Sequence, residues 1–315
     1  MEKSIVDISI ILVNFQNVKL TENCIYSLMA AKTKVSYEII VIDNHSEDGS
    51  VETLKNRFPQ LTIVDSGRNG GFAFGNNVGA KLAGGKYLLL LNNDTEVKDG
   101  MLDALYQFAE KTPEVGILGC QALDRNGIEL PIAHKYENLK RIWLQSYVKP
   151  ILEKMGLQRK LVKLAEHKDD GVAEFTSAEW IAGSAMFIKR KLYYKIGGLD
   201  ENYFMYMEDE DLCRRINNAG YKVGIISFVG YVHYCGGSTI QSYFLTKEYI
   251  KSRLIFFMRY EPHNFAAIKK QLYQQIAAVN KNINQSEREQ MKKELDEFVR
   301  DELPQITQHV AGIKG

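Results

Sequence analysis

The chain has 315 residues, of which 45% are hydrophobic and 25% are charged, a composition that suits a globular protein with a large core. The formal net charge of +1, from 40 basic and 39 acidic residues, excludes a global electrostatic attraction to nucleic acid. Its four cysteines lie far apart with no CxxC spacing, which argues against a zinc site or a disulfide framework and favours a reducing cytoplasm.

Targeting and membrane-spanning signals are absent from the sequence pattern. The chain enters a strand at Ile8 without the features of a signal peptide, and no apolar run approaches the roughly 20 residues that span a bilayer. We therefore expect a cytoplasmic enzyme.

Strand and helix patterns alternate through the first part of the chain. Buried strands are predicted at 7–15, 37–42, 61–65, 87–91 and 115–122. Helices are predicted between them, at 21–31, 51–58, 75–83 and 100–111. Strand–helix–strand crossovers are parallel and right-handed in nearly all cases, so this alternation predicts a Rossmann-like α/β fold, a mostly parallel sheet flanked by helices.

Polar side chains stand where the buried strands end. Asn14 ends the first strand, Asp43 the second, and Asn92-Asn93-Asp94 follows the apolar run 87–91. Ligands collect at the carboxyl ends of strands in such sheets. Asp43 needs a partner there, and the ring N–H of uracil or thymine is one. Asp94 is either a cap for the helix at 100–111 or a ligand for a charged cofactor.

A glycine-rich turn covers residues 68–77. Its glycines permit close backbone approach and Arg68 adds a fixed positive charge, so the turn suits a base and a diphosphate. It lacks both the P-loop and the GxGxxG patterns. The alternative is that Phe72 and Phe74 simply pack in the core.

Residues 124–176 carry no catalytic pattern, although 141–164 suggests one or two helices, and we expect an insertion on the acceptor side here. The strand 185–188 and the helix 190–196 follow a segment of small residues around Gly183. Trp180 is either a core residue or the wall of a sugar pocket.

An acidic cluster, Glu208-Asp209-Glu210-Asp211, precedes a helix predicted at 212–219. Acidic residues in a first helical turn complement the helix dipole. Four in a row exceed that need, and crowded carboxylates raise one another's pKa, as a general base requires. His233 follows a strand at 221–228; it is either structural or completes a metal site with Asp94.

The tail changes composition. Residues 244–260 predict a basic amphipathic helix, and helical pattern continues after Pro262 to about residue 302. These helices either pack on the catalytic domain, dock on a membrane surface or form a homodimer. We expect a catalytic domain at 1–240 and a helical extension at 241–315.

Seven segments occur in the order of a known family: VNF, IDNHSEDGS, RNGGFAFGNN, LLLLNNDTEV, WIAGSAMFI, GGLDENYFMYMEDEDLCRR and VHYCGGS. Over about residues 5–260 the chain resembles the family 2 glycosyltransferases of GT-A fold, within their bacterial rhamnosyltransferase-like branch.

The resemblance implies an inverting transfer from a nucleotide-sugar donor, with dTDP-rhamnose favoured over a UDP-sugar. The acceptor is then a glycan or lipid-linked saccharide of cell-surface polysaccharide synthesis, met at the inner face of the cytoplasmic membrane. Asp94, the last residue of a DxD-like segment whose first Asp is Asn92 here, and His233 are expected to hold Mg²⁺ or Mn²⁺. Asp209 matches the catalytic base, with Glu208 orienting the acceptor. The expected nucleotide-sugar contacts are Val13, Asn14, Asp43 (to the base), Arg68, Asn69, Gly70, Asn76, Asn92, Asn93 and Trp180.

Two other functions use similar features. A nucleotidyltransferase shares the sheet and the acidic metal ligands, but its basic glycine-rich loop near the N-terminus is lacking in VNFQNVKLTEN. A non-catalytic sugar-nucleotide binding module with an oligomerising tail would not need the acidic cluster.

Overall fold

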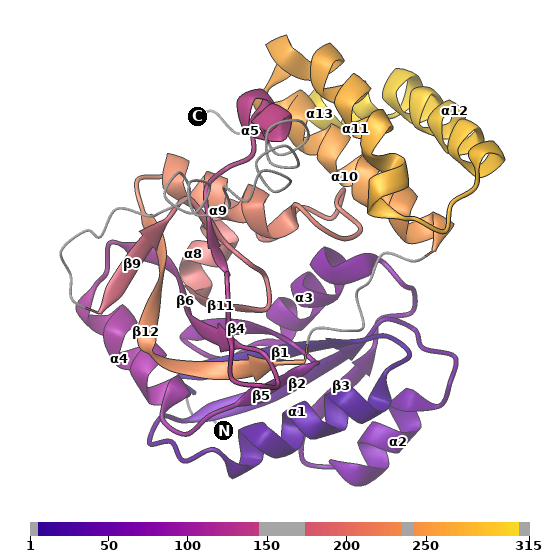
Figure 1. Ribbon diagram of the computed structural model, residues 1–315. Helices are drawn as coiled ribbons and strands as arrows, with labels where there is room; N and C mark the ends of the chain where they lie inside the picture. The colour runs from indigo at the N-terminus through magenta and orange to yellow at the C-terminus, as the bar shows by residue number, and fades with distance from the viewer. Residues whose placement is uncertain (1–5, 145–173, 235–241, 309–315) are drawn as a thin grey trace. The chain divides into compact units, whose positions relative to one another are not determined.

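The computed structural model describes residues 6–144, 174–234 and 242–308, which divide into two compact units (Figure 1). Of the described residues, the first unit contains 6–135, 174–201 and 208–234. The second contains 136–144, 202–207 and 242–308. The division at residue 240 stays a prediction; the second unit also takes in two segments from earlier in the chain.

The first unit is built on one long sheet. Its strands are ordered β3 (Thr62–Asp65), β2 (Tyr37–Asp43), β1 (Ile8–Asn14), β4 (Tyr87–Asn92), β11 (Ala185–Lys189), β6 (Val115–Leu123), β12 (Lys222–His233) and β5 (Thr95–Val97). The short strands β7 (Glu129–Leu130) and β9 (Phe175–Ala178) pair with β6 and β12, and β8 (Ala133–His134) pairs with β10 (Trp180–Ile181).

The predicted α/β class is confirmed, but the sheet is mixed rather than mostly parallel. The first four strands in this order, β3, β2, β1 and β4, are parallel to one another. β11 then starts beside the end of β4, with Ala185 opposite Leu91, and runs antiparallel to both β4 and β6. Its direction depends on where the preceding segment delivers the chain, which no local pattern specifies.

Helices cover both faces of this sheet (Figure 1). They are α1 (Val18–Ala30), α2 (Ser50–Arg57), α3 (Gly71–Leu82), α4 (Met101–Lys111), α8 (Arg190–Ile196) and α9 (Glu208–Asn218). Alternate residues of β1 point to opposite faces: Ile10 packs with residues of α1, α2 and α4, and Ile11 with residues of α3, α8 and α9. Both faces of the central strands are therefore buried, which explains their unbroken apolar runs.

The second unit is helical, as predicted for the tail. It contains α5 (Leu139–Trp143), α10 (Tyr243–Tyr260), η2 (Pro262–Asn264), α11 (Phe265–Val279), α12 (Gln285–Asp301) and α13 (Leu303–Gln308). The break between α11 and α12 is followed by a capping box, in which Asn284 and Glu287 bond each other's backbone N–H groups. Most of the predicted helical stretch 141–164 lies outside the described residues.

The basic residues of α10 do not form a free basic face. Lys247 lies 2.8 Å from the Glu294 carboxylate, and Arg253, which is buried, pairs with Glu137. Apolar residues of α10 such as Leu254 and Phe257 lie in a core shared with α11 and α12. No helix in the described part of the chain combines the length and the hydrophobicity that a membrane span requires.

Candidate active site

The carboxyl ends of β1, β2 and β4 lie side by side. The register places Asn14 beside Asp43 on one side of β1, and Val13 beside Asn92 on the other. The sheet thus brings the polar strand ends of the sequence analysis to one edge.

Asp43 is fully buried, and the chain itself supplies its partners. The Ser46 backbone N–H donates to Oδ1 at 2.6 Å, and the Asn14 amide Nδ2 donates to Oδ2 at 2.6 Å. A buried carboxylate needs hydrogen-bond donors, and these two groups of the chain supply them to Asp43. The contact of Asp43 with a nucleobase stays a prediction.

Asp94 and His233 meet at the other side of this edge. The last residues of β12 pair with β5, which follows Asp94 directly, so His233 lies opposite Thr95. Its Nε2 is 3.0 Å from Asp94 Oδ1, and the two side chains are 16% and 15% exposed. β12 was predicted to end at 228, but it continues to His233 after an irregularity between Ile226 and Gly230.

The pair suits a divalent cation in its chemistry, since a carboxylate and an imidazole both ligate Mn²⁺. Among the described residues no group of three or more His, Cys, Asp and Glu side chains forms a metal cluster. A metal ion held by Asp94 and His233 therefore needs further ligands from substrate and water, as Mg²⁺ and Mn²⁺ sites at phosphates commonly have.

Asp209 lies in the first turn of α9, which begins at Glu208 rather than at the predicted residue 212. Its Oδ2 accepts the Gly183 backbone N–H at 2.9 Å. The next residue, Ser184, accepts the backbone N–H of Asn92 at 3.0 Å through its carbonyl. These two contacts place Asp209 beside the end of β4.

A second link joins this segment to the strand that carries His233. The hydroxyls of Ser184 and Tyr231 are hydrogen-bonded at 2.6 Å, and Tyr231 stands two residues before His233 in β12. The carboxylate of Asp209 and the Asp94–His233 pair therefore lie at the same edge of the sheet, joined through residues 183 and 184.

The four acidic residues have different surroundings. Asp211 is fully buried and accepts Arg215 Nε at 2.7 Å, an ion pair within the helix. Burial raises the pKa of Glu208 well above its usual range, and the neighbouring Asp209 charge adds to this. Burial also raises the pKa of Asp209, against the lowering effect of the backbone N–H groups of Glu210 and Gly183. Glu208 Oε2 has no hydrogen-bond partner in the described part of the chain.

Arg68 stacks on an aromatic ring in the glycine-rich turn. Its guanidinium carbon lies 4.4 Å from the centroid of Phe74. A Cβ on Gly70 would lie 2.4 Å from Phe74, so only glycine fits beneath this ring. Asn69 Oδ1 accepts a hydrogen bond from the Gly71 backbone N–H. Helix α3 begins at Gly71, four residues before the predicted start. The turn holds a stacked cation near the ends of β2 and β3.

A family model described as "Glycosyl transferase family 2" matches residues 9–172, just over half of the chain. The chain belongs to glycosyl transferase family 2. The predicted family is thereby confirmed, and the protein is a glycosyltransferase.

Rhamnosyltransferases are among the proteins to which this glycosyltransferase is similar. The N-acetylglucosaminyl-diphospho-decaprenol L-rhamnosyltransferase of Mycobacterium tuberculosis is 26% identical over 222 residues, covering 67% of this chain and 71% of that protein. The rhamnosyltransferase WbbL of Escherichia coli is 27% identical over 206 residues, covering 63% of this chain and 73% of that protein.

Solved structures show the same fold at low identity. A crystal structure of GalNAc-T7 with UDP, GalNAc and Mn²⁺ aligns with a TM-score of 0.54 at 13% identity. A crystal structure of S. aureus TarS aligns with a TM-score of 0.51 at 14% identity. Each alignment covers 86% of this chain, which spans 55% of the first structure and 44% of the second. The predicted GT-A fold is confirmed.

Two residues that were predicted to contact the nucleotide-sugar donor form hydrogen bonds within the glycosyltransferase itself. Asn76 is fully buried in α3, and its Nδ2 donates to the Phe72 carbonyl at 3.0 Å. Trp180 donates its indole N–H to the Lys135 carbonyl at 3.1 Å and lies against the His134 ring. The structure gives both side chains a packing role, and their contact with a nucleotide sugar stays a prediction.

The sequence did not indicate several residues that hold the candidate site residues in place at the carboxyl edge of the sheet of this glycosyltransferase. Ser46 and Tyr231 hold Asp43 and Ser184, and Thr21 on α1 bonds both Asn14 and Asn93. A threonine inside a predicted helix gives no signal of this. The small residues around Gly183 were the one visible sign, since they allow close backbone approach.

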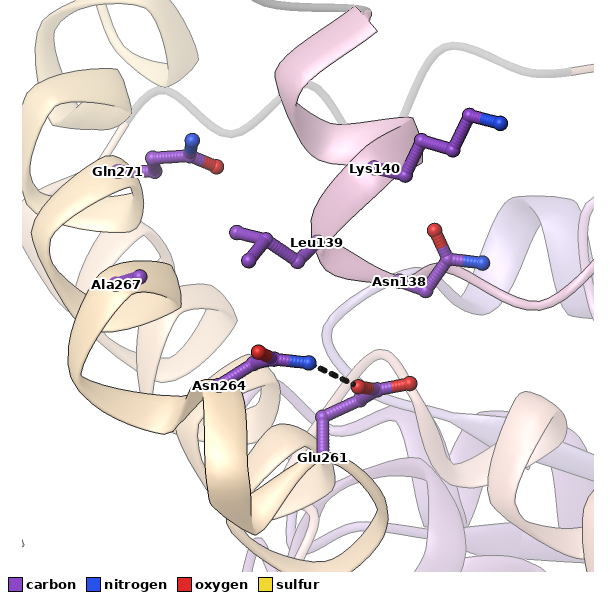
Figure 2. Close-up of a pocket in the computed structure, with 7 residues that line it drawn as sticks. All are labelled: Asn138, Leu139, Lys140, Glu261, Asn264, Ala267 and Gln271. Carbon is purple, nitrogen blue, oxygen red and sulfur yellow. Dashed lines mark hydrogen bonds between the residues drawn. The ribbon is translucent and has the colours of Figure 1, made fainter.

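A hollow of about 730 Å³ lies within the second unit, between α5 and α11. Figure 2 shows Leu139 and Gln271 extending into it from opposite sides, above a hydrogen bond from Asn264 to Glu261. Its lining residues are Asn138, Leu139, Lys140, Glu261, Asn264, Ala267 and Gln271. None of the predicted site residues lines this hollow, so it is not assigned to the nucleotide sugar.

Proposed function

We propose that the protein is an inverting rhamnosyltransferase that transfers rhamnose from dTDP-rhamnose to a hydroxyl of a saccharide or lipid-linked glycan. A UDP-sugar is the second choice of donor. The observation that carries the proposal is that Asp209 is linked through Gly183 and Ser184 to the edge of the sheet where Asp94 and His233 pair. The names of the relatives from Mycobacterium tuberculosis and Escherichia coli support the choice of sugar.

The proposed reaction is one in-line displacement at the anomeric carbon. The Asp209 carboxylate takes the proton of the acceptor hydroxyl, whose oxygen bonds to the anomeric carbon as the bond to the nucleoside diphosphate breaks on the opposite face. Burial suits this base, because a raised pKa makes the carboxylate a stronger proton acceptor. Glu208 stands beside it, where it orients the acceptor.

Asp94 and His233 are the residues that would hold Mg²⁺ or Mn²⁺. When bound, the metal ion supplies positive charge that stabilises the departing diphosphate. Arg68, stacked on Phe74, contributes fixed positive charge to the same group. The carboxyl edge of β1 and β2, with Asn14 and Asp43, receives the nucleoside.

The acceptor places the reaction at a membrane surface. The name of the Mycobacterium tuberculosis relative includes a decaprenol-linked diphosphate sugar. We infer a polyprenyl-linked acceptor at the inner face of the cytoplasmic membrane for this protein too. Binding to vesicles that contain such a lipid, compared with plain anionic vesicles, tests this point. Dimerisation through the C-terminal helices stays a prediction, to be tested by the mass of the protein in solution.

The test of the proposed function is rhamnosyl transfer by Asp209→Asn. The variant keeps the shape of the side chain but cannot accept the proton, so we expect a loss of at least about 100-fold in kcat. Its affinity for dTDP should stay near that of the wild type. Asp301→Asn, an exposed position of α12, is the matched control. Near-normal turnover by Asp209→Asn, or a product that retains the anomeric configuration of the donor, contradicts the proposed mechanism.

A further inference from the structure

A continuous chain of hydrogen bonds crosses three strands beneath the proposed nucleotide edge. Asn93 Nδ2 lies 2.8 Å from Thr21 Oγ1, Thr21 Oγ1 lies 2.7 Å from Asn14 Oδ1, and Asn14 Nδ2 lies 2.6 Å from Asp43 Oδ2. Thr21, Asn14 and Asp43 are fully buried, whereas Asn93 is half-buried. Water therefore does not compete for the inner three groups.

The direction of this chain follows from counting protons. An ionised carboxylate only accepts, so Asn14 must present its NH₂ group to Asp43 and its oxygen to Thr21. The single Thr21 proton then goes to Asn14 Oδ1. Thr21 Oγ1 is left as an acceptor, and only the NH₂ group of Asn93 can satisfy it.

The opposite orientation of the Asn93 amide is unfavourable. It would place Asn93 Oδ1 against Thr21 Oγ1 with one proton for two acceptors. If Thr21 instead donated to the Asn17 carbonyl, at 3.3 Å, it would desert Asn14 Oδ1, which has only the 3.5 Å contact with Asn93 Nδ2 besides. A buried acceptor without a donor costs about 1–3 kcal/mol.

The consequence is that Asn93 turns its Oδ1 away from the chain of hydrogen bonds. No donor to this oxygen is present in the described parts of the structure, and the side chain is partly exposed beside Asp94. The Asn93 oxygen is therefore presented as an acceptor, and a group of the ligand that binds it has to donate a hydrogen bond, as a hydroxyl does.

The order of the strands suggests which hydroxyl this is. Along the edge, Asp43 on β2 comes first, then β1, then β4 with Asn93 and Asp94. A nucleotide with its base at Asp43 and its diphosphate at Asp94 has its ribose between them. In a thymidine nucleotide, the 3′-hydroxyl is the free hydroxyl of that sugar.

We propose that Thr21 is a positioning residue that fixes the polarity of the Asn93 amide, so that Asn93 Oδ1 accepts the 3′-hydroxyl of the donor nucleotide. This inference rests on the proposed function, because it takes the donor to be a nucleoside diphosphate sugar. Thr21 acts through Asn93 and does not itself touch the donor.

The experiment compares the affinities of dTDP and 3′-deoxy-dTDP, measured by calorimetry in the presence of Mn²⁺. We expect the wild type to bind dTDP about five- to tenfold more tightly, the contribution of one hydrogen bond. Thr21→Val, which has the same shape without the hydroxyl, should lose this preference. Thr21→Ser, which keeps the hydroxyl, should retain it.

Thr246→Val is a matched control in the second unit. Thr246 is also fully buried, receives the Asn280 amide at 3.1 Å and donates to the Ser242 carbonyl at 2.8 Å. Its loss should affect stability similarly to that of Thr21 but leave the preference for dTDP unchanged. If Thr21→Val does not fold, Asn93→Ala replaces it, and it too should abolish the preference.

The inference is overturned if Thr21→Val keeps the full preference for dTDP, if Thr21→Ser loses it as Thr21→Val does, or if the wild type binds both nucleotides equally. A wild type that prefers UDP over dTDP is tested in the same way with 3′-deoxy-UDP, and there the proposed donor is wrong while the role of Thr21 is still decided. A wild type that binds neither dTDP nor UDP contradicts the proposed function itself, and the inference falls with it.

Discussion

His233 Nε2 lies 3.0 Å from Asp94 Oδ1, although 139 residues separate the two in the chain. The contact exists because the end of β12 pairs antiparallel with β5, the short strand that follows Asp94. Two residues that lie far apart in the sequence thereby come together near the end of β4.

This contact predicts a shared role in metal binding. Both Asp94→Asn and His233→Ala should weaken Mn²⁺ binding in the presence of dTDP by at least about tenfold, since each removes a ligand. Water-proton relaxation by bound Mn²⁺ measures the affinity. His263→Ala, at an exposed histidine of η2, serves as the control. Unchanged Mn²⁺ affinity in both variants, with transfer that EDTA leaves unaffected, would reject the site.

The raised pKa of Asp209 predicts the acid limb of the pH profile. The base must be ionised, and its pKa is raised, so activity should rise with pH through a midpoint above about 3.9, the ordinary value for aspartate. The dependence of kcat/KM on pH reports this midpoint for the free enzyme. A profile that stays flat down to pH 4 in a protein that remains folded would contradict a carboxylate of raised pKa as the base.

The burial of Glu208 predicts a pH-dependent cost in stability. Because the pKa of Glu208 is raised in the folded state, protonated Glu208 contributes to the free energy of unfolding at low pH. This contribution is lost as the pH rises through the folded-state pKa. Glu208→Gln removes the ionisation. We expect the Tm of Glu208→Gln to increase relative to that of the wild type as the pH increases from 4 to 8. The activity of the variant should be lower than that of the wild type.

Glu114→Gln, at an exposed position, is the control for this comparison and should show no such trend. A difference in Tm between Glu208→Gln and the wild type that is constant with pH would mean that Glu208 ionises as easily in the folded chain as in the unfolded one.

The ion pair of Asp211 with Arg215 predicts a structural role for the last acid of the cluster. Asp211→Asn removes the negative charge that lies 2.7 Å from Arg215 Nε, which should cost about 1.5–3 kcal/mol of unfolding free energy. Denaturant unfolding measures this loss. The kcat of the folded variant should stay within about threefold of wild type, in contrast to that of Asp209→Asn. A catalytic loss as large as that of Asp209→Asn, in a stable protein, would contradict this division of the cluster.

The close packing of Gly70 against Phe74 predicts an effect on donor binding. In Gly70→Ala, the new Cβ would lie 2.4 Å from Phe74, so the ring must move and Arg68 loses its platform. We expect the KM for the donor to rise about tenfold with little change in kcat, as for a loss of uniform binding. Phe74→Leu should act in the same way, and Phe74→Tyr should remain near wild type. An unaltered KM in both Gly70→Ala and Phe74→Leu would contradict the proposed role of Arg68 in binding the diphosphate of the donor.

Much of the fold was predictable from local patterns. The apolar runs that became β1, β2 and β4 end at Asn14, Asp43 and Asn92, within a residue or two of the predicted bounds. Burial of a strand on both faces requires an unbroken apolar run, and a parallel sheet sets the polar residues that follow at one edge. The order of the motifs also indicated the family.

The sequence by itself therefore determined the class of fold, the family and the edge at which the polar strand ends gather. The tertiary structure alone decided that β11 runs antiparallel, that His233 reaches Asp94, and that Thr21 links Asn14 to Asn93. The physical reason is the range of the interactions: periodicity and caps act over a few residues, whereas these contacts depend on how distant segments pack, and a lone Thr or His in the sequence carries no trace of its partner.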